Sequence, residues 1–358
     1  MQIAFYAFIF SKFLYLKDNS QTDDISYYKP VSVVVCAKNE FENLRKNLPF
    51  ILSQDFNVFE VIVIDDGSFD NSHLLLKEFE DLHPNFLSFR IEPHEKLHPG
   101  KKHALSYGVS LAKYEHIVVT DADCHPASKN WLTWMTQPLH KNADVVLGIS
   151  PLLGHVNFIN AFFKMEAYSV ALQYINFTLS GLPFMGVGRN MAYKKSVFEN
   201  HDMQQHWDLI SGDDDLFINA LSSDHTIKIV SKPDAFTFSN TPKNLSNWFQ
   251  QKLRHYTTGY HYDLMQKIWL GYYWSSSLFI YVLFFVAIGF LVLKQPIHPV
   301  PLVLLGSTLL LRWIITMRSI EKLGEKKLNW SLPALDFFYI LSVWVVSPLS
   351  RVTKFKWK

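Results

Sequence analysis

The sequence has few cysteines and little charge. Only Cys36 and Cys124 occur among its 358 residues. Two isolated cysteines form neither a zinc cluster nor a disulfide framework. Asp, Glu, Lys and Arg make up 18% of the chain and leave a formal net charge of only +2, which gives no reason to expect nucleic acid as a partner. Hydrophobic residues make up 49%, more than an ordinary soluble enzyme needs.

The hydrophobic excess gathers in three segments after residue 270. Leu270–Leu293 is long enough to span a bilayer and has no charged residue. Val300–Met317 can also span, and we expect Arg312, near one end, to extend its side chain to the interface. Ala334–Leu349 is shorter and contains Asp336. We therefore predict an integral membrane protein with two or three spanning segments in residues 270–350.

Positive charge indicates the orientation of these segments. The basic loop Arg318–Lys327 is typical of a cytoplasmic loop, which places the catalytic part in the cytoplasm, at the inner membrane of a cell. A full crossing by the third segment would put the basic tail Arg351–Lys358 on the opposite side. A re-entrant or interfacial third segment avoids this conflict, and the sequence leaves both possibilities open.

Two further segments are expected at the membrane. Residues 2–16 are apolar and aromatic but interrupted by Lys12, so they suit a short anchor or an interfacial helix and not a cleaved signal peptide. Residues 244–268 are amphipathic and suit an interfacial helix. Residues 155–185, rich in aromatic side chains, are expected as an amphipathic helix over the site or at the membrane surface.

Residues 31–243 show alternating strand and helix patterns. Continuous β-branched runs indicate strands that are buried on both faces, and the runs between them have helical spacing. We expect strands at Val31–Ala37, Val61–Ile64, Phe86–Ile91, His116–Thr120 and Ala143–Ile149, and helices at Asn39–Ser53, Asp70–Leu82 and His103–Ala112. This pattern predicts an α/β domain with a mostly parallel sheet, whose ligands bind at the carboxyl ends of the strands.

Acidic residues follow two of these strands. Asp121 and Asp123 come directly after the strand at 116–120, and carboxylates two apart can face one Mg²⁺ or Mn²⁺ ion together with substrate phosphates. A solvated turn is the alternative role of this triplet. Asp65 and Asp66 follow the second strand, where they form either an acidic turn or a hydrogen-bonding site for a nucleoside.

Three more motifs carry groups suited to chemistry. Lys101 precedes a helix, where it can bind phosphate, although a simple basic loop is the commoner explanation. Gly188 and Asn190 lie in a turn that can approach a sugar. The run Asp213–Asp215 places three carboxylates side by side, and this crowding can raise the pKa of one of them toward that of a general base. A helix start is the alternative role of this run.

The last motif lies in the amphipathic stretch. Gln251 and Arg254 are three residues apart and share a helix face. Arg254 can bind a departing diphosphate, although an interfacial basic helix explains these residues equally well.

Taken in order, the motifs resemble those of the family 2 glycosyltransferases of GT-A fold, and specifically their membrane-integrated synthase-like members. These relatives include cellulose, chitin and hyaluronan synthases and ceramide glucosyltransferase. The resemblance covers about residues 31–260 and rests on the ordered series VSVVVCAKNE, IDDGS, GKKHAL, TDAD, GVGRNMAY, SGDDDL and QKLRH. Each motif is weak alone, but seven in order are hard to obtain by chance.

The resemblance implies roles for these residues. Asp65, Asp66 and Lys101 would contact the nucleotide-sugar, together with Asp121, Gln251 and Arg254, and a metal ion at Asp121 and Asp123 would hold its diphosphate. Asp214 would be the catalytic base, with Asp213 the next candidate. Gly188, Asn190, Asp215 and His255 would form the acceptor or sugar site. His255 stands where the family usually has a tryptophan that helps shape the acceptor site in polymerising relatives.

The activity implied is inverting transfer of a sugar, with a UDP-sugar as the expected donor and a lipid or glycan hydroxyl as the acceptor. Two alternatives remain. A transferase acting on a polyprenyl phosphate needs no base to deprotonate its acceptor, so the intact SGDDDL and QKLRH motifs argue against it. A non-catalytic membrane scaffold would be expected to have lost its acidic motifs, and all of them are present.

Overall fold

The computed structural model describes residues 1–17, 28–92, 94, 100–155, 157–200, 209, 211–221, 225–296, 298–326, 328 and 331–353. The chain divides into two compact units. The sheet unit comprises residues 17–154, 183–242 and 353–358, and the helical unit comprises residues 1–16, 155–182 and 243–352. Most of the predicted tail Arg351–Lys358 and the end of the loop Arg318–Lys327 lie outside the described residues.

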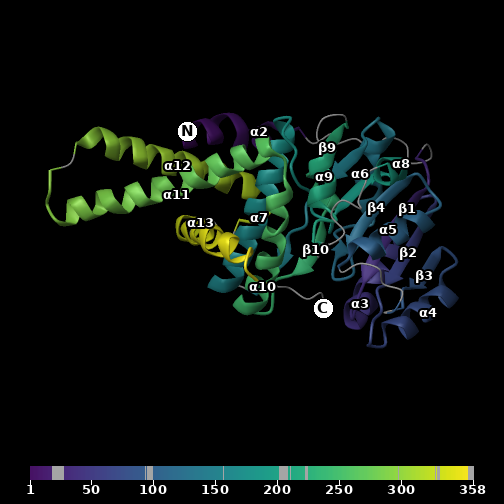
Figure 1. Cartoon of the computed structure of the whole chain (residues 1–358). Coiled ribbons are helices and arrows are strands. Elements are labelled where there is room, and N and C mark those ends of the chain that lie inside the picture. The colour runs from purple at the N-terminus through teal and green to yellow at the C-terminus, as the bar shows by residue number, and fades with distance from the viewer. Residues whose placement is uncertain are drawn as a thin grey trace. The chain divides into compact units, whose positions relative to one another are not determined.

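The sheet unit contains a seven-stranded sheet in the order β3-β2-β1-β4-β8-β6-β9 (Figure 1). Strands β3, β2, β1 and β4 are parallel, whereas β8 is antiparallel to both β4 and β6. The sheet is therefore mixed, and the part formed by β3, β2, β1 and β4 is parallel. Its strands are β1 Val31–Ala37, β2 Phe59–Asp65, β3 Phe86–Arg90, β4 His116–Asp121, β6 Val145–Leu147, β8 Met191–Lys194 and β9 Ile227–Ile229; the short strands β5 His125–Pro126, β7 Leu152–Leu153 and β10 Thr237–Asn240 form a second sheet.

Helices cover both faces of the larger sheet. Alternate residues of β1 and β2 pack in one apolar core with α3 and α6, and the intervening residues face α5, where Gly108 lies against Val34 and Ile64. A Cβ atom at Gly108 would lie 2.7 Å from Val34 Cγ1, so only glycine permits this approach. The helices of this unit are α3 Phe41–Leu52, α4 Ser72–Leu82, α5 Lys102–Leu111, α6 Trp131–His140, α8 Lys195–Glu199, α9 Asp215–Ala220 and the 3₁₀ turn η4 Pro233–Ala235. The predicted α/β architecture is confirmed.

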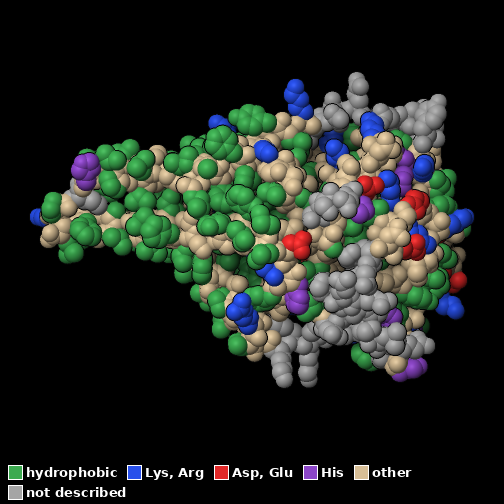
Figure 2. Space-filling view, turned by 45° about the horizontal axis from the view of Figure 1, so that its top comes forward, with side chains coloured by type: hydrophobic (Ala, Val, Ile, Leu, Met, Phe, Trp, Pro, Cys, Tyr) green, Lys and Arg blue, Asp and Glu red, His purple; other side chains and the backbone are tan. Residues whose placement is uncertain are grey.

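Among the described residues of the helical unit, three helices are long and apolar enough to cross a membrane, namely α11 Leu264–Val292, α12 Pro299–Lys322 and α13 Leu332–Leu349. Their exposed surface is largely hydrophobic, as the projecting α11–α12 region in Figure 2 shows. The helices of this unit are α1 Gln2–Ala4, the π-helical η1 Phe5–Phe10, α2 Lys12–Tyr15, α7 Phe158–Leu179, α10 Leu245–Tyr256, the 3₁₀ turn η5 Thr258–His261, α11 Leu264–Val292, α12 Pro299–Lys322 and α13 Leu332–Leu349. Helix α7 thus belongs to this unit, although it falls inside the range 31–243 predicted for the catalytic domain.

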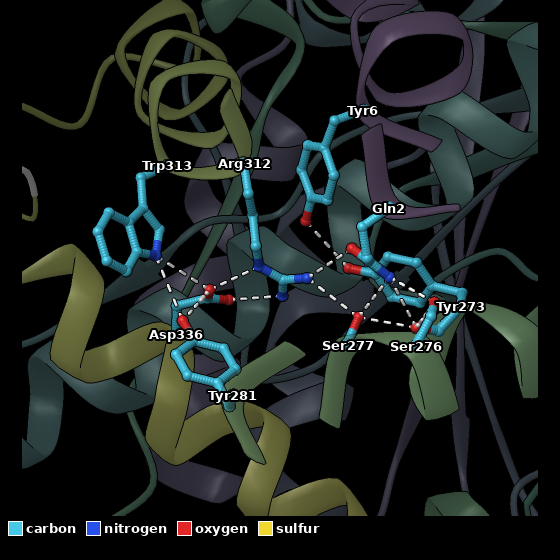
Figure 3. Close-up of polar contacts among 9 residues, drawn as sticks. All are labelled: Gln2, Tyr6, Tyr273, Ser276, Ser277, Tyr281, Arg312, Trp313 and Asp336. Atoms are coloured by element: carbon cyan, nitrogen blue, oxygen red, sulfur yellow. Dashed lines mark hydrogen bonds and ion pairs between the residues drawn. The ribbon is translucent and has the colours of Figure 1, made fainter. Parts of the chain in front are cut away.

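Arg312 does not reach an interface, and that prediction was wrong. Its side chain is 2% exposed and forms a two-pronged ion pair with Asp336 of α13, at 2.6 Å from Nε to Oδ2 and 2.7 Å from Nη2 to Oδ1 (Figure 3). Its Nη1 donates to Gln2 Oε1 and to Ser277 Oγ of α11. Tyr281 OH donates to Asp336 at 2.7 Å. An intramembrane charge is stable when paired in this way, so Arg312 joins α11, α12, α13 and the N-terminal segment.

The far end of α13 lies beside the start of α11. Tyr260, four residues before α11, donates its hydroxyl to Ser347 O at 2.8 Å, and the Arg351 guanidinium lies 4.4 Å from the Tyr260 ring centroid. Because α11 and α12 run antiparallel (Figure 1), the end of α12 lies at this same end of the unit. The end of α13 therefore lies at the same end of the unit as the end of α12. This arrangement favours the re-entrant or interfacial form of the third segment.

Candidate active site

The predicted motifs of the sheet unit meet at one edge of the sheet. At the carboxyl ends of the parallel strands β2, β1 and β4, Asp65 pairs with Ala37 of β1, and Asp121 pairs with the neighbouring Cys36. Because β8 runs antiparallel to β4, the turn that precedes β8 lies at this same edge, where Thr120 donates to the backbone oxygen of Arg189 at 2.8 Å. β2 and β3 lie on one side of β1, and the next strand along the chain, β4, lies on its other side. Sheets of this kind bind ligands at such a switch in strand order.

Lys101 connects two of the acidic motifs. It occupies the residue before α5, and its ammonium group contacts Asp121 Oδ1 and lies 3.6 Å from Asp213 Oδ2. The side chain of Lys101 is 11% exposed. Burial alone lowers the pKa of a lysine, but Asp121 and Asp213 outweigh it and raise the pKa of Lys101 well above its usual range. Lys101 is therefore a fixed cation between the TDAD and SGDDDL motifs.

Asp214 is held in place by two backbone N–H groups. Its Oδ2 accepts from Gly188 N and its Oδ1 from Asp215 N, both at 2.8 Å, and Asp214 is the N-cap of α9. Burial, followed by the charges of Asp213 and Asp215, raises the pKa of Asp214 to about 7. Each carboxylate oxygen keeps a further lone pair, so Asp214 can accept a proton near neutral pH. The backbone of Gly188 contributes to the site by orienting this carboxylate.

The pair Asp65–Asp66 is buried at the end of β2. Asp65 Oδ1 accepts from Ser68 N at 2.9 Å, and its Oδ2 lies 3.6 Å from Arg90 Nη1. Its carboxylate therefore stabilises the turn that includes Gly67, whose φ of 68° suits glycine. Asp66 is 4% exposed, so any nucleoside contact by either residue is made by a carboxylate that the fold already encloses.

Asp121 and Asp123 offer the oxygen ligands that Mg²⁺ or Mn²⁺ prefers. Partial removal from water, followed by the nearby charge of Asp121, raises the pKa of Asp123. Within the described residues no cluster of three or more His, Cys, Asp or Glu side chains is placed to hold an ion. A metal ion at these two carboxylates would therefore need its remaining ligands from a bound diphosphate.

Arg189 was not among the predicted site residues. Its charge lowers the pKa of Asp123, and its Nη1 donates to Ser239 Oγ of β10 at 2.9 Å. The signal was present in the sequence, because an arginine directly follows Gly188 in the turn before β8. Arg189 supplies a second cation beside the acidic pair.

Asn190 has a different environment from the one we expected. It is 1% exposed, and its amide accepts from Trp131 Nε1 and donates to the backbone oxygens of Ile149 and Ala235, at 2.8–3.0 Å. These three bonds join α6, the segment after β6 and η4. The placement favours a structural role for Asn190 over a contact with the sugar.

Gln251, Arg254 and His255 lie on α10, in the helical unit. Gln251 and His255 are exposed and Arg254 is half-buried. Arg254 Nη2 lies 3.3 Å from His255 Nε2. The three residues form one polar group at the end of this helix, and their place at the nucleotide stays a prediction.

Comparison with known proteins places this geometry in a family. Residues 32–202 match the family model described as glycosyl transferase family 2. The chain is 24% identical over 290 residues to a poly-beta-1,6-N-acetyl-D-glucosamine synthase of Staphylococcus epidermidis, covering 77% of this chain and 64% of that protein. It is 33% identical over 120 residues to the glycosyltransferase GlyG of Streptococcus pneumoniae, covering 33% of this chain and 38% of that protein. The chain thus spans less than two thirds of the length of these relatives.

One solved structure supports the fold over nearly the whole chain. The mannosyltransferase PcManGT of Pyrobaculum calidifontis, in complex with GDP-Man and Mn²⁺, superposes with a TM-score of 0.60 at 17% identity, covering 97% of this chain and 94% of that one. At this identity the likeness concerns the fold, which is GT-A. Residues 32–202 thus match a family 2 glycosyltransferase domain, and the fold is GT-A.

Proposed function

We propose that the protein transfers a sugar from a nucleotide-sugar to a hydroxyl group of a lipid or glycan at a membrane, with inversion at the anomeric carbon. The observation that carries this proposal is the meeting of Lys101, Asp121, Asp213 and Asp214 at one sheet edge. This arrangement provides cations and carboxylates for a diphosphate beside a carboxylate with a pKa of about 7.

Asp214 is the proposed base. Its carboxylate accepts the proton of the acceptor hydroxyl, whose oxygen attacks the anomeric carbon as the bond to the nucleoside diphosphate breaks. A general base works best with a pKa near the working pH, and burial beside Asp213 supplies that pKa. Asp213 is oriented toward Lys101 and is the weaker candidate.

The leaving diphosphate is bound by cations in this proposal. Lys101 and Arg189 lie at the sheet edge, and Gln251 and Arg254 of α10 are proposed to close over the nucleotide. Mg²⁺ or Mn²⁺ at Asp121 and Asp123, when bound, supplies Lewis-acid neutralisation of the phosphate charge. Asp65 and Asp66 are proposed to support the nucleoside end. His255 and Asp215 are proposed to shape the acceptor site.

Membrane attachment follows from the helical unit. Three helices are long and apolar enough to span, and we propose that they hold the sheet unit at the cytoplasmic face of the inner membrane. Such a site can take an acceptor from the lipid or a growing glycan at its surface. The S. epidermidis relative is named as a polysaccharide synthase, which supports a glycan product.

The test uses the full chain in lipid nanodiscs, a panel of UDP- and GDP-sugars and Mn²⁺. We expect nucleoside diphosphate release from one donor that depends on added acceptor, and its loss in Asp214→Asn with nucleotide binding retained. Asp81→Asn, an exposed aspartate on α4, is the matched control and should behave as the wild type. Unchanged turnover in Asp214→Asn contradicts the base assignment. A product on a polyprenyl phosphate would replace the proposed acceptor, and no binding of any nucleotide would contradict the activity itself.

A further inference from the structure

An ion pair enclosed by protein joins α10 to α7. The Lys252 ammonium lies 2.6 Å from Glu166 Oε1, and the two side chains are only 13% and 4% exposed. A buried carboxylate is costly unless it is paired. The two helices are far apart in sequence, so the pair fixes a contact that local helix formation cannot provide.

An aromatic contact lies one turn away from this ion pair on both helices. Trp248 precedes Lys252 by four residues, and Phe162 precedes Glu166 by four, so each pair shares a helix face. The Trp248 ring lies edge-on to Phe162 at 5.1 Å and stacks on Phe163 at 6.2 Å between ring centroids. The aromatic contact and the ion pair are thus four residues apart on α10 and also four residues apart on α7.

The ion pair is a directional contact between α10 and α7, and α10 also packs against α13. The short ion pair adds a directional, charge-assisted contact to the aromatic contacts of Trp248. Trp248 and Lys252 lie on the contact face, whereas Gln251, next to Lys252, is exposed and Arg254 is half-buried. The orientation of the polar group at the end of α10 therefore depends on Glu166.

We infer that Glu166 and Lys252 are positioning residues that aim Gln251 and Arg254 at the nucleoside diphosphate. This inference rests on the proposed function, because it assigns the nucleotide as the target of Arg254. Neither residue of the pair touches the substrate. Their effect is transmitted through the rotation and the axial position of α10.

The experiment compares Glu166→Gln and Lys252→Met, which keep side-chain size and remove one charge each, in the full chain in nanodiscs. We expect each to raise the KM for the nucleotide-sugar about tenfold and to accelerate hydrogen exchange in residues 245–256 but not in α11. We expect Lys252→Arg to retain wild-type KM. The double variant Glu166→Gln/Lys252→Met should be no worse than the more impaired single variant, because the two residues act as a unit.

Lys164→Met with Glu325→Gln is the matched control. Lys164 lies on α7 two residues from Glu166 and pairs with Glu325 at 3.3 Å, with no residue of α10 in that pair. This control should leave the KM and the exchange of α10 unchanged. If it raises both as Glu166→Gln does, the effect is general destabilisation of α7 and the inference is wrong.

Arg254→Ala separates this inference from the proposed function. If Arg254→Ala raises the KM but Glu166→Gln changes neither the KM nor the exchange of α10, the positioning role is overturned while the proposed function stands. If Arg254→Ala and Asp214→Asn both turn over normally, the proposed function fails. Exchange in α10 then still shows whether the ion pair holds this helix, but without a role for it in catalysis the positioning inference fails too.

Discussion

The ammonium group of Lys101 contacts the carboxylate of Asp121, so the protein already supplies a cation where we propose that a metal ion binds. The same lysine lies 3.6 Å from Asp213. One positive charge thus holds the proposed metal-binding motif and the proposed base motif together before any ligand arrives. A divalent ion at Asp121 must compete with this charge.

Lys101→Met is therefore expected to tighten the binding of Mn²⁺ in the absence of nucleotide, by roughly tenfold, because a positive charge in contact with the ligand carboxylate is removed. Titration followed by the electron paramagnetic resonance signal of free Mn²⁺ measures this directly. The same variant should bind nucleoside diphosphate more weakly. Lys113→Met, an exposed lysine outside the site, should leave both affinities as they are. Weaker Mn²⁺ binding in Lys101→Met would show that the lysine does not compete for Asp121.

The rate of sugar transfer should rise with pH through about 7. Asp214 acts as a base only when deprotonated, and its pKa is raised to about 7, first by burial and then by Asp213 and Asp215. Below that pH, kcat should fall about tenfold for each pH unit. The measurement is kcat at saturating donor and acceptor between pH 5 and pH 9.

Removing a neighbouring charge tests the cause of this pKa. In Asp213→Asn the repulsion that disfavours ionised Asp214 is weaker, so the rise in kcat should move to lower pH. A rise that stays near pH 7 in Asp213→Asn would assign the titration to another group.

The free energy of unfolding should fall much further when one partner of the Arg312–Asp336 pair is replaced than when both are replaced. Arg312→Leu leaves the buried Asp336 uncompensated, and we expect a loss of about 3–5 kcal/mol in the free energy of unfolding. The double variant Arg312→Leu/Asp336→Leu should recover a large part of that loss. Thermal unfolding in nanodiscs, followed by tryptophan fluorescence, compares the three proteins. Equal stability of all three would mean that this ion pair does not join the helices.

Gly108→Ala should destabilise the sheet unit by roughly 1–3 kcal/mol, because the new methyl group would lie 2.7 Å from Val34 Cγ1. Displacement of α5 would also move Lys101, so the KM for the donor should rise. Gly271→Ala on α11, where no atom lies within 4 Å of the added carbon, is the control and should be neutral. The check is denaturant unfolding together with donor KM.

The parallel half of the sheet was predictable because its signal is local. The uninterrupted run Val31–Ala37 forms a strand with the same bounds, and β1 is buried along its whole length. The two- and three-residue strands β5, β7 and β9 have no such run, and they form because β10 offers backbone partners to β5 and β7, and β6 offers them to β9. The antiparallel direction of β8 depends in the same way on a crossover that no short window of sequence reveals.

The sequence indicated which residues form the candidate site, but it did not indicate most of the contacts that these residues make. The resemblance assigned Asp121, Asp213 and Asp214 to one site, and the structure brings Asp121 and Asp213 together around Lys101. The enclosed roles of Asp65 and Asn190 were not visible, because a buried amide or carboxylate resembles an exposed one in sequence. Arg312 was misplaced for a related reason, since hydropathy along one helix contains nothing about a partner 24 residues later.

The ion pair of Arg312 and Asp336 also bears on how the protein is made. Asp336 is translated 24 residues after Arg312, which at ordinary rates of synthesis is a delay of roughly one to five seconds. During that interval Asp336 is not yet available to Arg312. Of the partners that Arg312 has in the finished fold, Gln2 and Ser277 have already been synthesised. A ribosome that stalls before α13 emerges leaves a chain with an unneutralised intramembrane cation, a form that a cell's membrane quality control can recognise.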